Sequence, residues 1–127
     1  MGVKMNTKGI ILGGGHATRL YPVTKSVIYL DLTKRTIRGL HYQLGRPQAK
    51  LTWVLSGQIL DVVVGIRKSS PNFGKWLGID LSDENKRGLY MPPNFAHGFC
   101  AISREAEIFY KCTDFYAPEN ERCIPME

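Results

Sequence analysis

The sequence predicts an all-β fold, a β-sandwich or barrel, and three observations support this prediction. Short runs rich in β-branched and aromatic residues recur along the chain, turn-forming groups separate them, and hardly any helical periodicity is present. The expected strands are residues 26–32, 50–60, 61–66, 76–81 and 107–113. The turn groups are residues 56–57, 69–72, 82–85 and 92–94, which are rich in Ser, Gly, Pro, Asn and Asp.

The N-terminal part of the chain has a different texture. Residues 8–12 (KGIIL) form a short apolar run that leads directly into Gly13-Gly14-Gly15, as a buried strand feeding a glycine-rich turn would. Such a turn can cradle phosphate when a helix follows, but Tyr21-Pro22 comes too soon for one. We therefore divide the chain into an N-terminal segment, residues 1–35, and a β domain, residues 36–127.

Composition favours an anionic small-molecule partner. The 127 residues include 17 Lys and Arg against 11 Asp and Glu, a formal charge of +6, which attracts nucleotides, phosphosugars, nucleic acid or membrane headgroups. The basic residues are scattered and form no nucleic-acid module, so we expect no nucleic-acid partner. No apolar stretch approaches the roughly 20 residues that span a bilayer, so we expect no membrane partner.

The cysteines indicate a reducing compartment. Cys100, Cys112 and Cys123 are an odd number without C-x-x-C spacing, and the chain begins without a signal-peptide pattern. We expect reduced thiols in a soluble, cytoplasmic protein.

The string Thr36-Ile37-Arg38-Gly39-Leu40-His41-Tyr42-Gln43 resembles the T-x-R-G-L-H-[YF]-Q motif of dTDP-4-dehydrorhamnose 3,5-epimerases, which are cupin-fold enzymes. The resemblance continues in order to the end of the chain. Its further motifs are Lys50-Leu51, Gly57, Asp61-Val62, residues 67–71, Phe73-Gly74, Trp76, Leu81-Ser82, residues 84–87, Pro92, residues 95–99, Tyr110-Lys111, Thr113-Asp114, residues 116–119 and Glu121. The resemblance implies a cupin jelly-roll, a homodimer, no cofactor and a dTDP-4-keto-6-deoxyhexose substrate.

The N-terminal segment resembles another family. Residues 8–14 and 18–25 are similar to the opening of glucose-1-phosphate thymidylyltransferases, although Gly15-His16-Ala17 departs from that family's G-G-x-G-T-R-L loop. The segment stands where the epimerase family has N-terminal strands. The chain also ends at Glu127, short of the family's tail and of its aspartate that partners the catalytic histidine. Relative to the epimerase family, we therefore expect a jelly-roll that is incomplete at both ends.

Epimerisation beside a keto group requires a base, a cation or donor for the enolate oxygen, and an acid on the opposite face. By resemblance His41 is the base, Lys50 stabilises the enolate oxygen and Tyr110 is the acid. From the residues alone structural roles are favoured: His41 as a hydrogen-bonded strand histidine, Lys50 as a solvated edge lysine and Tyr110 as a tethered core aromatic. The surrounding motif reverses that preference. We place Lys50 across a hairpin from His41.

Three further residues carry supporting roles by resemblance. Arg38 is expected to bind substrate, because its planar guanidinium suits phosphate or a polarised oxygen. Asp61 and His97 are expected to line the pocket, with a structural ion pair and a turn histidine as their alternatives. We expect no metal: His41 lacks the H-x-H pattern of metal-binding cupins, and the three histidines are dispersed.

Three functions remain in competition. The favoured one is epimerisation of dTDP-4-dehydro-6-deoxy-D-glucose at C3 and C5. The second is a catalytically impaired cupin that binds a nucleotide sugar or a partner subunit, because the tail aspartate that supports the histidine is absent from the sequence. The third is a nucleotidyltransferase fragment, in which nucleotide affinity would depend on Arg19 and Lys25.

Overall fold

The computed structural model describes residues 26–125 and contains almost only β-strands. Among these residues the one helix is a three-residue 3₁₀-helix, η2, at Pro118–Asn120. The strands in chain order are β1 Ser26–Thr33, β2 Ile37–Gln43, β3 Lys50–Ser56, β4 Gln58–Gly65, β5 Trp76–Ser82, β6 Gly88–Met91, β7 Phe95–Ala101, β8 Glu105–Cys112 and β9 Glu121–Cys123.

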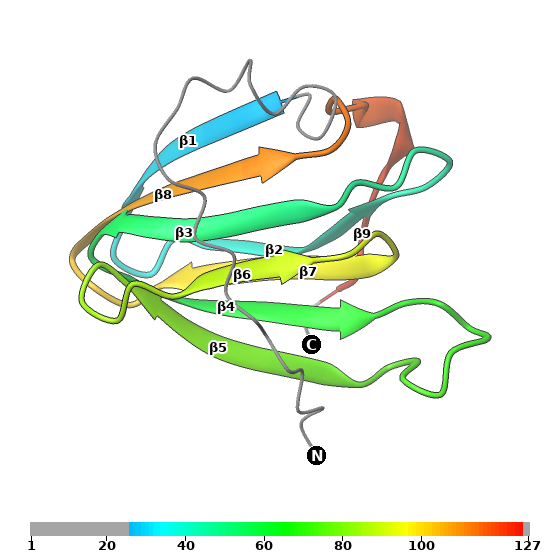
Figure 1. Cartoon of the computed structure of the whole chain (residues 1–127), viewed down its shortest axis with the longest axis horizontal. Helices are drawn as coiled ribbons and strands as arrows, with labels where there is room; N and C mark the ends of the chain where they lie inside the picture. Colours follow the sequence, from blue (N-terminus) through cyan, green and yellow to red (C-terminus); the bar gives the residue numbers. More distant parts are fainter. Residues whose placement is uncertain (1–25, 126–127) are drawn as a thin grey trace.

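The described strands form two antiparallel sheets that face each other as a sandwich (Figure 1). The first sheet has the order β1-β8-β3-β6, and the second has the order β5-β4-β7-β2-β9. Neighbouring strands in each sheet are mostly distant in sequence, as in a jelly-roll. Each sheet is therefore built from well-separated segments of the chain. The predicted all-β class is confirmed.

The structure has a strand at each predicted position between residues 26 and 113, but two of the predicted boundaries are wrong. The expected run 50–60 is two strands, because the chain turns at Gly57 and passes from β3 in the first sheet to β4 in the second. Gly57 has φ +80°, and a Cβ there would collide with the backbone oxygen of Glu105. Strand β4 therefore begins at Gln58 and runs through the boundary expected at Asp61.

Four strands had not been predicted from the sequence alone: β2, β6, β7 and β9. Strand β1 pairs along its whole length with β8, from Ser26 opposite Cys112 to Thr33 opposite Glu105. It lies on the N-terminal side of the boundary at residue 35, and that division stays a prediction. The apolar run at 8–12, its glycine turn, Arg19 and Lys25 lie outside the described residues.

Alternation along the strands builds the core. In β4 the residues Ile59, Asp61 and Val63 are buried, whereas Leu60 and Val62 between them are only partly buried. Leu81 of β5 and Ile108 of β8 are fully buried from the two opposite layers and belong to the same cluster. The only helix in residues 26–125 is η2, and it is far too short to cross a membrane.

Candidate functional site

A cavity of about 460 Å³ opens between the two sheets. It is lined from the second sheet by Arg38, His41 and His97, and from the first sheet by Lys50 and Tyr110. The structure therefore brings five of the six residues predicted for the site to one cavity. The sixth, Asp61, is fully buried and contacts the cavity only through His97.

His41 and Lys50 meet across the sandwich. Lys50 Nζ lies 3.3 Å from His41 Nε2, an arrangement in which the ammonium donates a hydrogen bond to the ring nitrogen. The predicted hairpin between these residues is wrong, because β2 pairs with β7 and β9 whereas β3 pairs with β6 and β8. Their contact comes from two facing layers, and so Lys50 is no solvated edge lysine.

The surroundings of His41 hold its ring in the neutral form. Burial, followed by the positive charge of Lys50 and then by His97 and Arg38, lowers the pKa of His41 to about 3. Among the described residues, no carboxylate is hydrogen-bonded to the His41 ring, whose recorded partner is Lys50. Burial also lowers the pKa of Lys50 from its ordinary value, because the charged ammonium loses hydration.

His97 and Asp61 form a buried ion-pair geometry beside this contact. His97 Nε2 lies 2.9 Å from Asp61 Oδ2 and 2.8 Å from Oδ1, and both residues are almost inaccessible to solvent. The off-axis Oδ1 and the opposite ring nitrogen, Nδ1, make no hydrogen bond with described residues. His97 lies within β7, so the turn alternative is wrong; its ring meets His41 edge-on at 5.7 Å between centroids.

Tyr110 enters the cavity from β8, beside Lys50. Burial raises the pKa of Tyr110 to about 12, so the phenol keeps its proton at neutral pH. Lys50 Nζ lies 5.9 Å from the centre of the Tyr110 ring. The ammonium of Lys50 is thus near both the imidazole from one layer and the phenol from the other.

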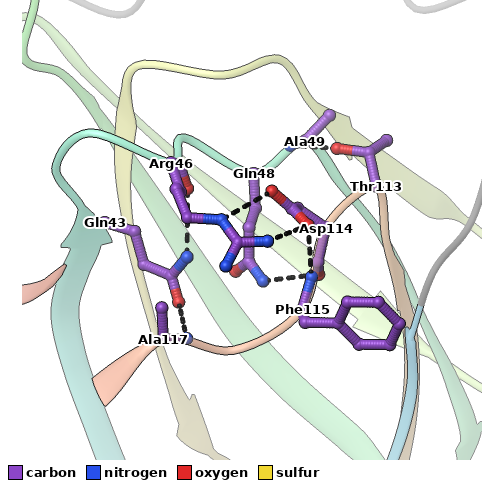
Figure 2. A network of polar contacts seen from close by, with 8 residues as sticks. All are labelled: Gln43, Arg46, Gln48, Ala49, Thr113, Asp114, Phe115 and Ala117. Carbon is purple, nitrogen blue, oxygen red and sulfur yellow. Dashed lines mark hydrogen bonds and ion pairs between the residues drawn. The ribbon is translucent and has the colours of Figure 1, made fainter. Parts of the chain in front are cut away.

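A network of hydrogen bonds joins the two loops at the cavity mouth (Figure 2). Arg46 binds Asp114 through two parallel hydrogen bonds, Nε to Oδ2 at 3.2 Å and Nη2 to Oδ1 at 2.8 Å. Gln48 donates to the Asp114 carbonyl at 2.7 Å, and the Gln43 amide links the Arg46 carbonyl to the backbone N–H of Ala117. This network fixes the β2–β3 loop against the loop that follows β8.

Sequence reasoning missed the part that these mouth residues play. Gln43 and Gln48 line the cavity, as do Tyr116 and Glu121, and the Tyr116 hydroxyl donates a 2.7 Å hydrogen bond to Glu121. That bond raises the pKa of Tyr116. Tyr116 and Glu121 belong to the motifs that carry the family resemblance, which was the one available signal, but spacing alone assigns them no partner.

No group of three or more His, Cys, Asp or Glu side chains between residues 26 and 125 is placed to hold a metal ion. The expectation of a site that works without a metal or cofactor stays a prediction. All three cysteines lie between residues 26 and 125, and none of them forms a disulfide bond there.

A jelly-roll sandwich with an imidazole, an ammonium and a phenol around one interlayer cavity defines a cupin-type protein suited to proton transfer. The sequence model of the family described as dTDP-4-dehydrorhamnose 3,5-epimerase matches residues 18–127. The chain belongs to this family of sugar-nucleotide isomerases. The match begins within the segment that resembles a thymidylyltransferase.

Curated relatives with this description are similar over about 70% of the chain. The enzyme from Shigella flexneri is 56% identical over 93 residues, which are 72% of this chain and 51% of that protein. The enzyme from Pseudomonas aeruginosa is 53% identical over 88 residues, 69% of this chain and 49% of that protein. The chain thus spans about half the length of the curated relatives it matches.

Solved structures show the same fold. A 3,5-epimerase from Legionella pneumophila in complex with dTDP-4-keto-L-rhamnose has a TM-score of 0.79 at 43% identity, covering 87% of this chain and 62% of that one. A 3'-monoepimerase from Streptomyces bikiniensis in complex with dTDP-quinovose has a TM-score of 0.77 at 29% identity, covering 81% of this chain and 52% of that one.

Proposed function

We propose that this chain epimerises dTDP-4-dehydro-6-deoxy-D-glucose at C3 and C5, towards dTDP-4-dehydro-L-rhamnose. One observation carries the proposal: the ammonium of Lys50 lies 3.3 Å from His41 Nε2 and 5.9 Å from the centre of the Tyr110 ring, and His41 and Tyr110 enter one cavity from opposite layers. These are the three groups that proton exchange beside a ketone requires. The Legionella pneumophila relative, with a dTDP-4-keto sugar bound, supports this choice of substrate class.

In the proposed reaction, His41 takes the proton from the carbon next to the 4-keto group. The electron pair of the broken C–H bond moves into the carbonyl, and Lys50 stabilises the resulting enolate oxygen. Tyr110 then returns a proton to the opposite face of the carbon. Its phenolate recovers a proton from solvent, and His41 releases to solvent the proton that it took, so both groups are regenerated. A phenol whose pKa is about 12 is protonated at neutral pH and can act as this donor.

The Lys50–His41 contact implies an exchange of partners when substrate binds. The ring nitrogen that accepts from Lys50 is not free to take a proton, so Lys50 must transfer its hydrogen bond from His41 to the 4-keto oxygen. This movement also relieves part of the effect that lowers the pKa of His41, because the developing negative charge offsets the ammonium. Binding thereby prepares the base.

Arg38 is proposed to hold the diphosphate at the cavity, because a guanidinium matches phosphate oxygens with two parallel hydrogen bonds. His97 supports His41 through their edge-on ring contact, and Asp61 holds His97 through its hydrogen bond to Nε2. We further propose a homodimer, as the family resemblance implies, located in the cytoplasm, where cysteines without disulfide bonds are expected.

The test is incorporation of solvent deuterium into dTDP-4-keto-6-deoxyglucose, followed by NMR, with His41→Ala as the matched control. Label at C3 and C5 with the wild-type chain, and none with folded His41→Ala, is the expected result. Label at only one position would show that the chain is a monoepimerase, as the Streptomyces bikiniensis relative is described, and would contradict epimerisation at both carbons. No label from folded wild-type protein would overturn the proposal.

A second function is favoured by the electrostatics of His41. A ring whose pKa is about 3 and which has no carboxylate partner among the described residues is a weak base. Such a site suits a cupin that binds the nucleotide sugar without turning it over. Saturable dTDP binding combined with absent deuterium exchange would select this alternative, whereas exchange at both carbons would exclude it.

A further inference from the structure

Arg38 and His41 are three residues apart, a spacing at which a regular β-strand cannot direct both side chains into one site. Side chains three residues apart on a β-strand point to opposite faces, because the side-chain period is two. Yet both residues lie in β2 and both line the interlayer cavity. Something in β2 must therefore reverse the alternation between them.

The register with β7 locates this reversal. Arg38 is opposite Phe99 and His41 is opposite His97, so β2 advances three residues while β7 advances two. Gly39 and Leu40 consequently stand against the single residue Gly98, which is the arrangement of a β-bulge. Phe99 and His97 are both buried. The residues opposite them face the same interior.

The outer side of the sheet fits the same picture. Leu40 and Gly98 line a small apolar hollow there, together with Leu60 and Val62 of β4. Val62 is the register partner of Gly98 and alternates with the buried Asp61 and Val63. The extra residue of the bulge, Leu40, is thus accommodated on the outer side. Arg38 is exposed and also touches this hollow, but its register opposite Phe99 keeps it on the same side of β2 as His41, and both line the interlayer cavity.

Gly98 has no room for a side chain. A Cβ at this position would lie 2.8 Å from the Arg38 carbonyl oxygen, 2.9 Å from Gly39 Cα and 3.3 Å from Leu40 Cδ2. The two nearest atoms belong to the backbone of the bulge and cannot rotate away. Gly98 does not have a positive φ, so the need for glycine here is one of space.

We propose that Gly98 and the bulge at Gly39-Leu40 form a positioning device that turns Arg38 and His41 toward the same cavity. The role of that pairing in sugar-nucleotide chemistry rests on the proposed function. Gly98 touches no substrate in this proposal; it acts through the backbone of β2. This lack of space explains why the H-G-F string has glycine at position 98.

The experiment compares Gly98→Ala with Gly78→Ala, a matched substitution in β5 of the same sheet. At Gly78 the nearest atoms to a new Cβ are side-chain carbons of Trp76 and Leu60, at 3.5 and 3.6 Å, which is ordinary contact. Two quantities are measured on folded protein at one temperature: dTDP affinity by calorimetry, and the pH titration of the His41 ring by NMR.

We expect Gly98→Ala to weaken dTDP binding by roughly 10- to 100-fold, the range for losing a hydrogen-bonded charged contact. We also expect the pKa of His41 to rise towards its ordinary value, because collapse of the bulge separates the ring from Arg38 or from the interior. Gly78→Ala should match wild type in both. A folded Gly98→Ala that matches Gly78→Ala in both quantities would overturn the proposal, whatever its melting temperature.

The titration needs no ligand, so a wild-type chain that fails to bind dTDP would count against the proposed function while leaving the bulge testable. If Gly98→Ala does not fold, backbone NOEs of the wild-type protein test whether the bulge is present. NOEs that join His41 to His97 and Arg38 to Phe99 support the device. NOEs that join Leu40 to His97, as a regular ladder continuing from Arg38 requires, would refute it.

Discussion

Acid should destabilise the folded protein through His41, and replacing this histidine with glutamine should remove that contribution. The pKa of His41 is lowered from 6.5 to about 3 in the folded protein. The unfolded chain therefore binds a proton in this pH range that the folded chain does not. The contribution of neutral His41 to the free energy of unfolding is fully present above the pKa of the histidine in the unfolded chain. It is lost as the pH falls towards the pKa of His41 in the folded protein.

The size of this effect follows from the same two values. A gap of about 3.5 pH units, at about 1.4 kcal/mol for each, gives about 5 kcal/mol as an upper value. The ring is only partly buried, and solvent screening reduces this to about 2 to 3 kcal/mol. Since only part of the range is crossed between about pH 7 and about pH 4.5, the expected loss there is about 1 to 1.5 kcal/mol.

Urea unfolding of wild type and His41→Gln at these two pH values measures the effect. Carboxylates titrate in both proteins, so their contribution cancels in the difference between the two losses. Wild type should lose about 1 kcal/mol more than the variant on acidification. Equal losses would show that His41 keeps an ordinary pKa, and the electrostatic account of the site would then fail.

Three other substitutions test separate parts of the structure. Lys50→Met should raise the pKa of His41, because the ammonium 3.3 Å away is removed. NMR titration of the ring measures this pKa, and an unchanged value would contradict the prediction. Arg46→Gln should lower the free energy of unfolding by only about 0.5 to 1 kcal/mol, because its ion pair with Asp114 is partly exposed. A loss above roughly 2 kcal/mol would mean that the hydrogen-bond network at the cavity mouth stabilises the whole fold. Leu81→Ala, at a fully buried core position, should cost about 2 to 5 kcal/mol in the same urea assay, and a loss below about 1 kcal/mol would contradict the described core.

The fold class could be predicted from the sequence because strand and turn signals are local. Runs such as the one at Trp76–Ser82 satisfy the strand pattern on their own. Which sheet a strand joins is not a local property. The segment from His41 to Lys50 contains turn formers and resembles a hairpin, but the chain there crosses from one layer to the other.

The site shows the same division between what is local and what is not. Family motifs led to His41, Lys50 and Tyr110, and these residues do meet in one cavity. The bulge in β2 was hidden, because a strand period of two places Arg38 and His41 on opposite faces. Only the register with β7 reveals it, and register depends on residues more than 50 positions away.

The central claim, that His41 removes the proton and Tyr110 returns one from the opposite face, is tested most directly with Tyr110→Phe. Solvent deuterium exchange and formation of the inverted sugar are measured by NMR in the same sample. The account predicts that the variant still exchanges deuterium without inversion, because removal and return from the His41 side persist while the opposite donor is lost. Inversion at the wild-type rate in Tyr110→Phe would contradict the assignment of acid and base to opposite walls.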